Sequence, residues 1–190
     1  MKLIIGIGNP GKEYEKTRHN VGFVTLDKII KNLEKDPGEE FELNQKFSAQ
    51  IAQIKIKKSK VILVKSQLFV NNTGQAVKKI KNFYKIRPED IVVIHDDLDT
   101  PFGKTKLCFN SGSGGHKGIQ SIIDGLKTQK FYRLKIGTSN KDLVKARKEK
   151  NSKKRIEGIG HFVLSEFPKI EQSKLNSVFK QAIEKIESIM

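Results

Sequence analysis

Hydrophobic and polar positions along the chain change period repeatedly, and each change predicts a new strand or helix. Runs of apolar and β-branched residues bounded by glycine or charged turns are typical of buried strands. The pattern predicts strands at 2–8, 90–95, 104–109 and 131–137, and a hairpin of two strands over 47–66 that turns at "KKSK". The runs at 2–8 and 90–95 are apolar at most positions, as expected of strands that are buried on both faces of a sheet.

Apolar residues at helical spacing fall between the predicted strands. The expected helices run from Asn20 to the Pro37–Gly38 pair, over 73–85, over 114–126 behind a glycine loop, and from Ser173 to the end of the chain. Strands and helices that alternate in this way favour a three-layer α/β fold, with helices on both faces of one twisted, mixed sheet. No repeat or linker divides the chain, so residues 1–190 are expected to form a single domain.

The segment "KDLVKARKEKNSKKR" (141–155) departs from this regular pattern. It contains eight lysines and arginines and two acids, with few apolar positions to pack on a core. We therefore expect a basic, solvated and mobile segment over about 138–158. Such segments often become ordered on nucleic acid, so a role in phosphate contact is compatible with a loop.

Composition narrows the class of partner. The chain has 37 Lys and Arg against 21 Asp and Glu, a formal net charge of +16. This excess favours a polyanion such as nucleic acid, although a generally lysine-rich proteome would also explain it. Cys108 is the only cysteine, which excludes an internal disulfide and a cysteine-built zinc site. No apolar run is long enough to span a membrane, and a cytoplasmic protein is expected.

Gly6, Gly8 and Gly11 form a G-x-G-x-x-G pattern directly after the first strand. In a dinucleotide-binding turn these glycines open a helix whose N-terminus receives the pyrophosphate. Here residues 12–20, "KEYEKTRHN", lack the apolar face that such a helix needs, and Pro10 removes a backbone donor. The pattern therefore does not favour a nicotinamide-dependent oxidoreductase.

Polar residues instead gather where several predicted strands end. His19 lies in the first loop, "HDDLD" follows the strand at 90–95, and Asn71 and Asn72 begin a helix after the hairpin. A histidine beside a carboxylate can act as a general base near neutral pH. The same residues are also compatible with different roles: either asparagine could cap its helix, the acidic run could bind a divalent metal, and His116 could be structural or bind phosphate. These residues indicate a hydrolase or a phosphate-binding protein.

Five blocks in order resemble the signatures of bacterial-type peptidyl-tRNA hydrolases. They are "GIGNPGKEYEKTRHNVGF", "LFVNNTGQAV", "HDDLDTPFGK", "GSGGHKGI" and "FYRLKIG", and the resemblance resumes at "GHFVLSEF" (160–167). It implies a monomeric enzyme that cleaves the ester between a peptide and the 3′-terminal ribose of tRNA. Neither a metal nor an organic cofactor is expected from the family.

The resemblance also assigns roles to individual residues. His19 stands at the position of the general base, Asp96 at that of the supporting carboxylate, and Asn9 at that of the residue that senses a blocked α-amine. Positions that line the site for the tRNA 3′ end and the peptide are occupied by Tyr14, Phe69, Asn71, His116 and Lys117. Basic positions that contact tRNA phosphate are occupied by Lys106 and Lys135.

Several residues depart from the family pattern. Val70 and Asn72 replace a methionine and a leucine, Cys108 stands at a basic position, and Lys117 replaces an asparagine, so it cannot accept a hydrogen bond. The longer basic segment after the strand at 131–137 is expected to compensate as a lid over the acceptor arm. A non-catalytic RNA-binding relative of the same fold is the alternative, which the retention of His19 and Asp96 disfavours.

Overall fold

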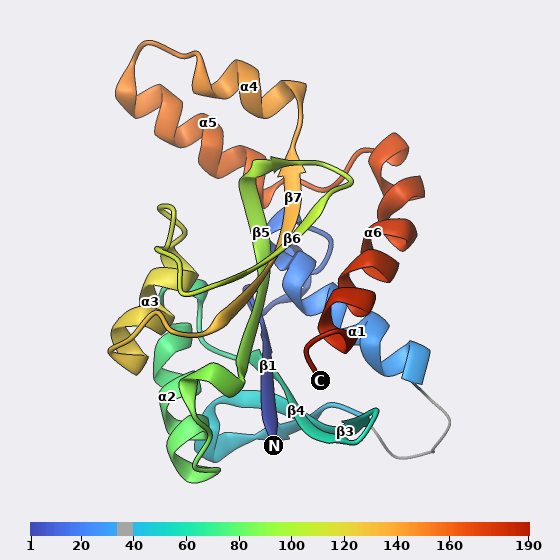
Figure 1. The fold of residues 1–190 in the computed structure, drawn as a ribbon. Helices are drawn as coiled ribbons and strands as arrows, with labels where there is room; N and C mark the ends of the chain where they lie inside the picture. The colour runs from blue at the N-terminus through green and yellow to red at the C-terminus, as the bar shows by residue number, and fades with distance from the viewer. Residues whose placement is uncertain (34–39) are drawn as a thin grey trace.

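The computed structural model describes residues 1–33 and 40–190 (Figure 1). In this part of the chain, seven strands form one sheet in the order β2-β3-β4-β1-β5-β7-β6. The strands are β1 (Lys2–Gly6), β2 (Glu42–Asn44), β3 (Ala49–Ile56), β4 (Ser59–Ser66), β5 (Ile91–Pro101), β6 (Thr105–Phe109) and β7 (Tyr132–Ser139). Strands β4, β1, β5 and β7 are parallel, whereas β2, β3 and β6 add to them in antiparallel orientation.

Helices cover both faces of this sheet. They are α1 (Val21–Leu33), α2 (Thr73–Phe83), α3 (Lys117–Leu126), α4 (Lys141–Arg147), α5 (Ser152–Leu164) and α6 (Lys169–Glu187). Figure 1 shows α1 and α6 on one side of the strands, α2 and α3 on the other, and α4 and α5 beyond the end of the sheet. The expected α/β fold with one mixed sheet between two helical layers is confirmed.

Alternate residues of each central strand supply the two halves of the core. Ile4 of β1 packs with Leu26 of α1 and Phe179 of α6, whereas its neighbour Ile5 packs with Ile80 of α2 and Ile122 of α3. Side chains alternate between faces with a period of two, so a strand covered on both sides must be apolar throughout. The apolar run that predicted β1 follows from this arrangement.

The predicted elements are present, but some of their boundaries were wrong. Strand β5 continues through "HDDLDTP", so Asp96, Asp97 and Asp99 lie inside the strand and not in a turn after it. Pairing with β7 extends β5 beyond its apolar run, and the sequence of β5 alone does not reveal this pairing. Helix α6 begins at Lys169, four residues before Ser173. The expected helix end at Pro37–Gly38 lies outside the described residues.

The basic segment expected over about 138–158 is largely helical and is not a loop. Helices α4 and α5, with the turn between them, span residues 141–164, which we call the basic hairpin. Asn140 and Asn151 cap its two helices: the Asn140 side chain accepts from the Asp142 and Leu143 amides, and that of Asn151 accepts from the Lys154 amide. Capping and tertiary contacts therefore stabilise helices whose apolar pattern is weak.

Within the described residues, no helix is both long enough and apolar enough to cross a membrane.

Candidate active site

The polar residues of interest gather at one edge of the sheet, where the parallel strands β1, β4, β5 and β7 end. Asn9 follows β1, Phe69 follows β4, Asp96 lies within β5 and Lys135 within β7. Open α/β sheets bind ligands at this carboxyl edge because loops from several strands meet there. The fold thus brings together residues that are more than one hundred positions apart in sequence.

The loop after β1 is not a dinucleotide cradle. Gly11 has a φ of 117°, a conformation that favours glycine, and two short 3₁₀ turns, η1 (Lys12–Tyr14) and η2 (Arg18–Asn20), follow it. Helix α1 begins only at Val21, so its N-terminus does not open at the glycine turn. The loop instead carries Asn9 on one end and His19 on the other.

His19, Asp96 and His116 form the centre of the site. His19 Nδ1 lies 2.9 Å from Asp96 Oδ1, and His116 Nε2 lies 3.0 Å from the same oxygen. The His116 Nδ1 atom caps α3 by accepting from the Gly118 amide at 3.1 Å, so the ring proton sits on Nε2 and is donated to Asp96. An ionised carboxylate only accepts, so His19 also donates from Nδ1, which leaves the His19 Nε2 lone pair available.

Burial and these contacts shift the protonation equilibria in a consistent direction. Asp96 is 2% exposed; burial alone would raise its pKa, but His19 and His116 together lower it well below its usual range. For His19, burial lowers the pKa, and the charge of Asp96 and its hydrogen bond outweigh this and raise it above 6.5. Asp96 therefore stays ionised and stabilises a proton that His19 acquires.

His95 is a buried neighbour of this group that sequence reasoning did not single out. Its Nδ1 lies 2.6 Å from the Asp96 carbonyl oxygen, and its ring meets His116 edge to face at 4.9 Å. Burial, followed by the repulsion of His116, lowers its pKa to about 3. His95 is therefore neutral near pH 7, donates from Nδ1 to the Asp96 carbonyl oxygen, and adds no positive charge beside His19 and Asp96.

Two groups of residues could in principle hold a metal ion: the acidic run "HDDLD", and the group of His19, Asp96 and His116. The three acidic side chains of "HDDLD" diverge: Asp96 meets the histidines, Asp97 accepts from Thr100, and Asp99 accepts from Arg147 at 2.8 Å. One atom each of His19, Asp96 and His116 lie within 4.8 Å of one another, close enough to hold an ion. However, the His116 Nε2 proton points at the carboxylate, and a metal would have to displace it. Hydrogen bonds between the three residues account for the arrangement.

Asn9 is held by hydrogen bonds that leave one of its groups unused. Its backbone amide donates to Asn20 Oδ1 at 3.0 Å, and Asn20 Nδ2 donates back to the Asn9 carbonyl at 2.9 Å. The Asn9 Oδ1 atom accepts from the Val70 amide at 3.0 Å. This contact orients the side chain so that Nδ2 is the donor available to a ligand. It also fixes the turn η4 (Val70–Asn72), and with it the exposed Asn71, beside the loop.

Two aromatic residues that the resemblance placed at the substrate site lie together. The rings of Tyr14 and Phe69 meet edge to face with their centroids 6.3 Å apart, and Phe69 is 55% exposed. Phe69 directly precedes η4, so the pair lies next to the turn that Asn9 holds. An exposed aromatic face beside a polar site is suited to stacking on an unpaired base.

The predicted phosphate-binding lysines are cross-strand neighbours. Lys106 of β6 pairs in register with Lys135 of β7, and Lys135 Nζ lies 3.6 Å from Asp97 Oδ1. Two like charges opposite each other destabilise a sheet unless an anion offsets them, and Asp97 offsets only part of this charge. Lys117 is exposed at the start of α3, one residue from His116. Cys108 pairs with Arg133, but Arg133 is fully buried, so this pair presents no cation to a ligand.

Sequence reasoning missed how His116 and Arg18 are used. The interaction of His116 with Asp96 was not expected, although the glycine loop before it marked a helix start. Arg18 is buried and contacts Ser165, Glu166 and Glu171, which lie about 150 residues further along the chain. A sequence separation of this size leaves no local signal.

The fold and this group of residues define an α/β protein with a histidine–aspartate pair of the kind that activates water for hydrolysis. The model of the Peptidyl-tRNA hydrolase family matches residues 3–190, and the chain belongs to that family. The resemblance seen in the sequence motifs is thereby confirmed.

Individual relatives agree with this assignment. A peptidyl-tRNA hydrolase of Aquifex aeolicus is 41% identical over 184 residues, which cover 96% of this chain and 86% of the relative. One of Listeria innocua is 37% identical over 188 residues, 98% and 92% of the two chains. The crystal structure of the Acinetobacter baumannii peptidyl-tRNA hydrolase superposes with a TM-score of 0.84 at 30% identity, covering 98% of this chain and 87% of that one.

Proposed function

We propose that the protein hydrolyses the ester between the peptide and the 3′-terminal ribose of peptidyl-tRNA, with His19 as general base. The observation that carries this proposal is the hydrogen bond from His19 Nδ1 to the buried Asp96, which leaves His19 Nε2 as the proton acceptor. His19 is 13% exposed in its side chain, so a water at Nε2 would be partly shielded from solvent. The reaction would release tRNA from peptidyl-tRNA that has dropped off the ribosome. We expect it to occur in the cytoplasm.

The reaction begins when His19 Nε2 takes a proton from water and the hydroxide attacks the ester carbonyl carbon. Asp96 stabilises the imidazolium that forms. When the tetrahedral intermediate collapses, the carbon–oxygen bond to the ribose breaks and the imidazolium returns its proton to the 3′ oxygen. An ester is more reactive than an amide, so the proposed route uses neither a covalent nucleophile, a metal nor an organic cofactor.

Asn9 and Asn71 have distinct parts in this scheme. The Asn9 Nδ2 group donates to the carbonyl oxygen of the peptide's last amide, because its Oδ1 is already bonded to the Val70 amide. A free aminoacyl-tRNA carries an ammonium there, which offers no acceptor, and so it is discriminated against. Asn71 donates to the developing oxyanion, and one well-placed donor of this kind contributes about 3 kcal/mol to transition-state stabilisation.

The remaining residues hold the tRNA. Tyr14 and Phe69 stack on the terminal base, while Lys106 and Lys135 contact phosphate near the 3′ end. His116 holds Asp96, and Lys117 contacts a ribose or phosphate in place of the amide that the family has at this position. The basic hairpin binds the acceptor arm as a helical lid. We expect the protein to act as a monomer with peptidyl-tRNA as its partner.

The test of this function is release of an N-acetylated aminoacyl group from tRNA by the purified protein at enzyme excess. We expect rapid release from the acetylated substrate and little from the same tRNA with a free α-amine. If the tRNA binds but neither ester is cleaved, the protein is instead a non-catalytic RNA-binding relative. The comparisons do not favour that alternative, and the intact pair of His19 and Asp96 also argues against it.

A further inference from the structure

Arg18, the residue before His19, is buried at the point where the basic hairpin joins the rest of the protein. Its Nη1 donates to Ser165 Oγ at 2.6 Å and to the Glu166 carbonyl, in the segment that connects α5 with α6. The guanidinium also lies 4.4 Å from the ring centroid of Phe162 in the last turns of α5. The C-terminal end of the hairpin is therefore attached directly to the loop between β1 and α1, which carries His19 and which we call the catalytic loop.

Glu171 connects the other end of the hairpin to the same arginine. One carboxylate oxygen of Glu171 accepts from Arg18 Nη2 at 3.1 Å, and the second accepts from Asn140 Nδ2 at 2.7 Å. Asn140 uses its Oδ1 to cap α4, accepting from the Asp142 amide at 2.9 Å and also from the Leu143 amide. Both ends of the amide side chain are thus occupied, and its orientation is fixed.

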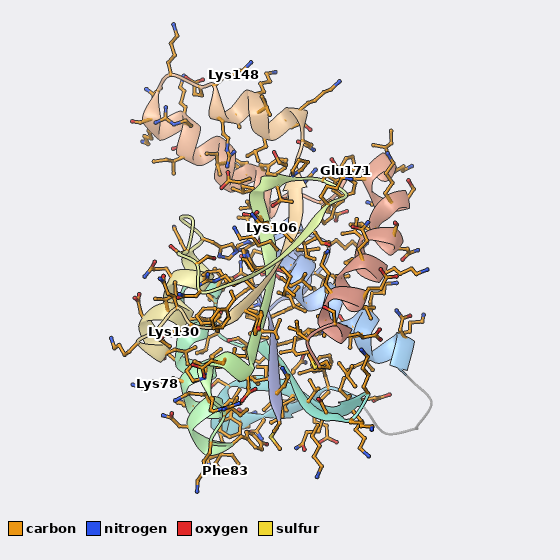
Figure 2. The ribbon with its side chains drawn as sticks, in the orientation of Figure 1. Lys78, Phe83, Lys106, Lys130, Lys148 and Glu171 are labelled. Carbon is orange, nitrogen blue, oxygen red and sulfur yellow. The ribbon has the colours of Figure 1, made fainter. Side chains whose placement is uncertain are left out.

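These contacts link both ends of the basic hairpin to the residue beside His19. Figure 2 shows Glu171 in the first turn of α6, close to the base of the hairpin, with Lys148 further out on the hairpin itself. We propose that Asn140, acting through Glu171 and Arg18, is a positioning residue that holds the basic hairpin in a set orientation to His19, so that an acceptor arm bound by the hairpin brings its ester to the base. This inference rests on the proposed function.

The chemistry of the contacts favours positioning over stability as their role. Arg18 and Glu171 are both buried, and the desolvation of a buried ion pair cancels much of its Coulombic attraction. A network of this kind adds little net stability but allows few alternative geometries. Among the described residues, a further polar attachment of the hairpin to the sheet runs from Arg147 to Asp99, but both side chains are exposed and such pairs contribute little. At the α4 end, the orientation of the hairpin therefore depends on Asn140 and on the buried Leu143.

The test replaces Asn140 with serine, which still caps α4 but cannot reach Glu171. A matched control is Asn151→Ser, the same substitution at the cap of α5, where the side chain meets only the Lys154 amide. Each variant is assayed on full-length N-acetyl-aminoacyl-tRNA and on an N-acetyl-aminoacyl CCA trinucleotide, which lacks the acceptor stem that the hairpin is proposed to bind. Asn140→Asp, which keeps the cap and places a carboxylate against Glu171, is the second variant.

We expect N140S and N140D to lower kcat on the full-length substrate by about tenfold, the scale of one lost charge-assisted hydrogen bond. Their kcat on the trinucleotide should match the wild-type value, and the kcat of N151S should match it on both substrates, whatever the effect of that change on KM. The loss belongs in kcat because misplacement of the ester slows the chemical step while the hairpin still binds phosphate.

Two outcomes would overturn the inference. If N140S and N140D lose activity equally on both substrates, the contact of Asn140 with Glu171 acts on the catalytic loop and not on the hairpin. If they lose no activity, the orientation of the hairpin does not depend on this contact. A variant with Lys148, Lys150, Lys153 and Lys154 replaced by alanine separates this from the proposed function. An unchanged KM in that variant would show that the hairpin does not bind tRNA, and the positioning role would fail with it.

Discussion

At the scale of single residues, the site depends on how Asp96 Oδ1 is shared. This oxygen accepts from His19 on one side and from His116 on the other, and the Gly118 amide fixes His116 through its Nδ1 atom. The arrangement keeps Asp96 ionised and sets the tautomer of His19. His116 weakens the effect of Asp96 on His19, because any stabilisation that His116 gives to the carboxylate reduces the attraction of the carboxylate for the His19 proton.

Asp96→Asn should move the acidic limb of the pH–rate profile to lower pH. In the wild type, Asp96 raises the pKa of His19 above 6.5, so kcat/KM falls as the pH drops through a value above 6.5. Without the carboxylate charge, burial acts unopposed and the pKa falls below 6.5. Activity at the plateau should fall by about 10²-fold or more because the imidazolium loses its support. A limb that stays in place would contradict the role of Asp96.

His116→Asn should shift the same limb in the opposite direction. Asparagine still caps α3 but is too short to donate to Asp96 as the imidazole does. Asp96 then has one donor fewer and interacts more strongly with His19, which raises the pKa of His19 further. The pH–rate profiles of the two variants, measured side by side, test this sign. A limb at lower pH in H116N would show that His116 supports the catalytic pair by another route.

At the scale of elements, the loop between β1 and α1, which carries His19, is positioned by the close approach of α1 to the strands. A Cβ atom on Gly22 would lie 2.5 Å from Ile7 N, Ile7 O and Ile94 O. Only glycine permits this approach, which brings the turn before α1 down onto the end of β1. The position of His19 three residues earlier follows from this contact.

Gly22→Ala should therefore lower the free energy of unfolding by about 3 kcal/mol or more, since backbone atoms cannot move aside for the added methyl group. The matched control is Gly160→Ala in α5, where an added Cβ meets nothing within 4 Å. That change should raise stability by about 0.5 to 1 kcal/mol through helix propensity. Urea unfolding measures both values, and a G22A protein as stable as G160A would contradict the packing described.

Strands and helices that bury many apolar side chains could be predicted from the sequence, and those that bury few could not. The runs at 2–8 and 90–95 predicted β1 and β5 correctly because burial on both faces requires apolar residues throughout. The basic hairpin was missed because its helices bury few side chains, among them Leu143 and Phe162. Asn140 and Asn151 were readable as caps, but without an apolar face a cap alone does not indicate a helix.

At the scale of the whole molecule, the chain has a net charge of +16, and the basic hairpin carries a dense part of its positive charge. Eight of its residues between 141 and 155 are Lys or Arg, and Figure 2 shows Lys148 projecting away from the body. Phosphate binding by such a surface is largely independent of sequence and weakens with salt.

Replacing Lys148, Lys150, Lys153 and Lys154 with alanine should raise KM for full-length substrate. The slope of log KM against log salt should fall by about one for each phosphate that the variant no longer binds. The control replaces an equal number of exposed lysines outside the hairpin: Lys55, Lys58 and Lys60 at the turn between β3 and β4, and Lys78 of α2. It removes the same net charge, so an equal effect in the two variants would show that only overall charge matters.

The site as a whole could be predicted only in part. The motifs around His19 and Asp96 indicated a histidine–carboxylate pair, and the structure places the two side chains 2.9 Å apart. The contacts of His116 with Asp96 and of Arg18 with Glu171 join residues 20 and 153 positions apart. Partners of this kind are selected by the arrangement of the whole sheet, and no local pattern encodes them.

The central claim, that His19 is the base that activates water, is tested most directly by single-turnover hydrolysis of N-acetyl-aminoacyl-tRNA. The comparison is His19→Ala against His161→Ala, the same substitution at an exposed histidine of α5. We expect the rate to fall by about 10²- to 10⁴-fold in H19A, with tRNA binding unchanged, and to remain at the wild-type value in H161A. Equal rates in H19A and H161A would contradict the account.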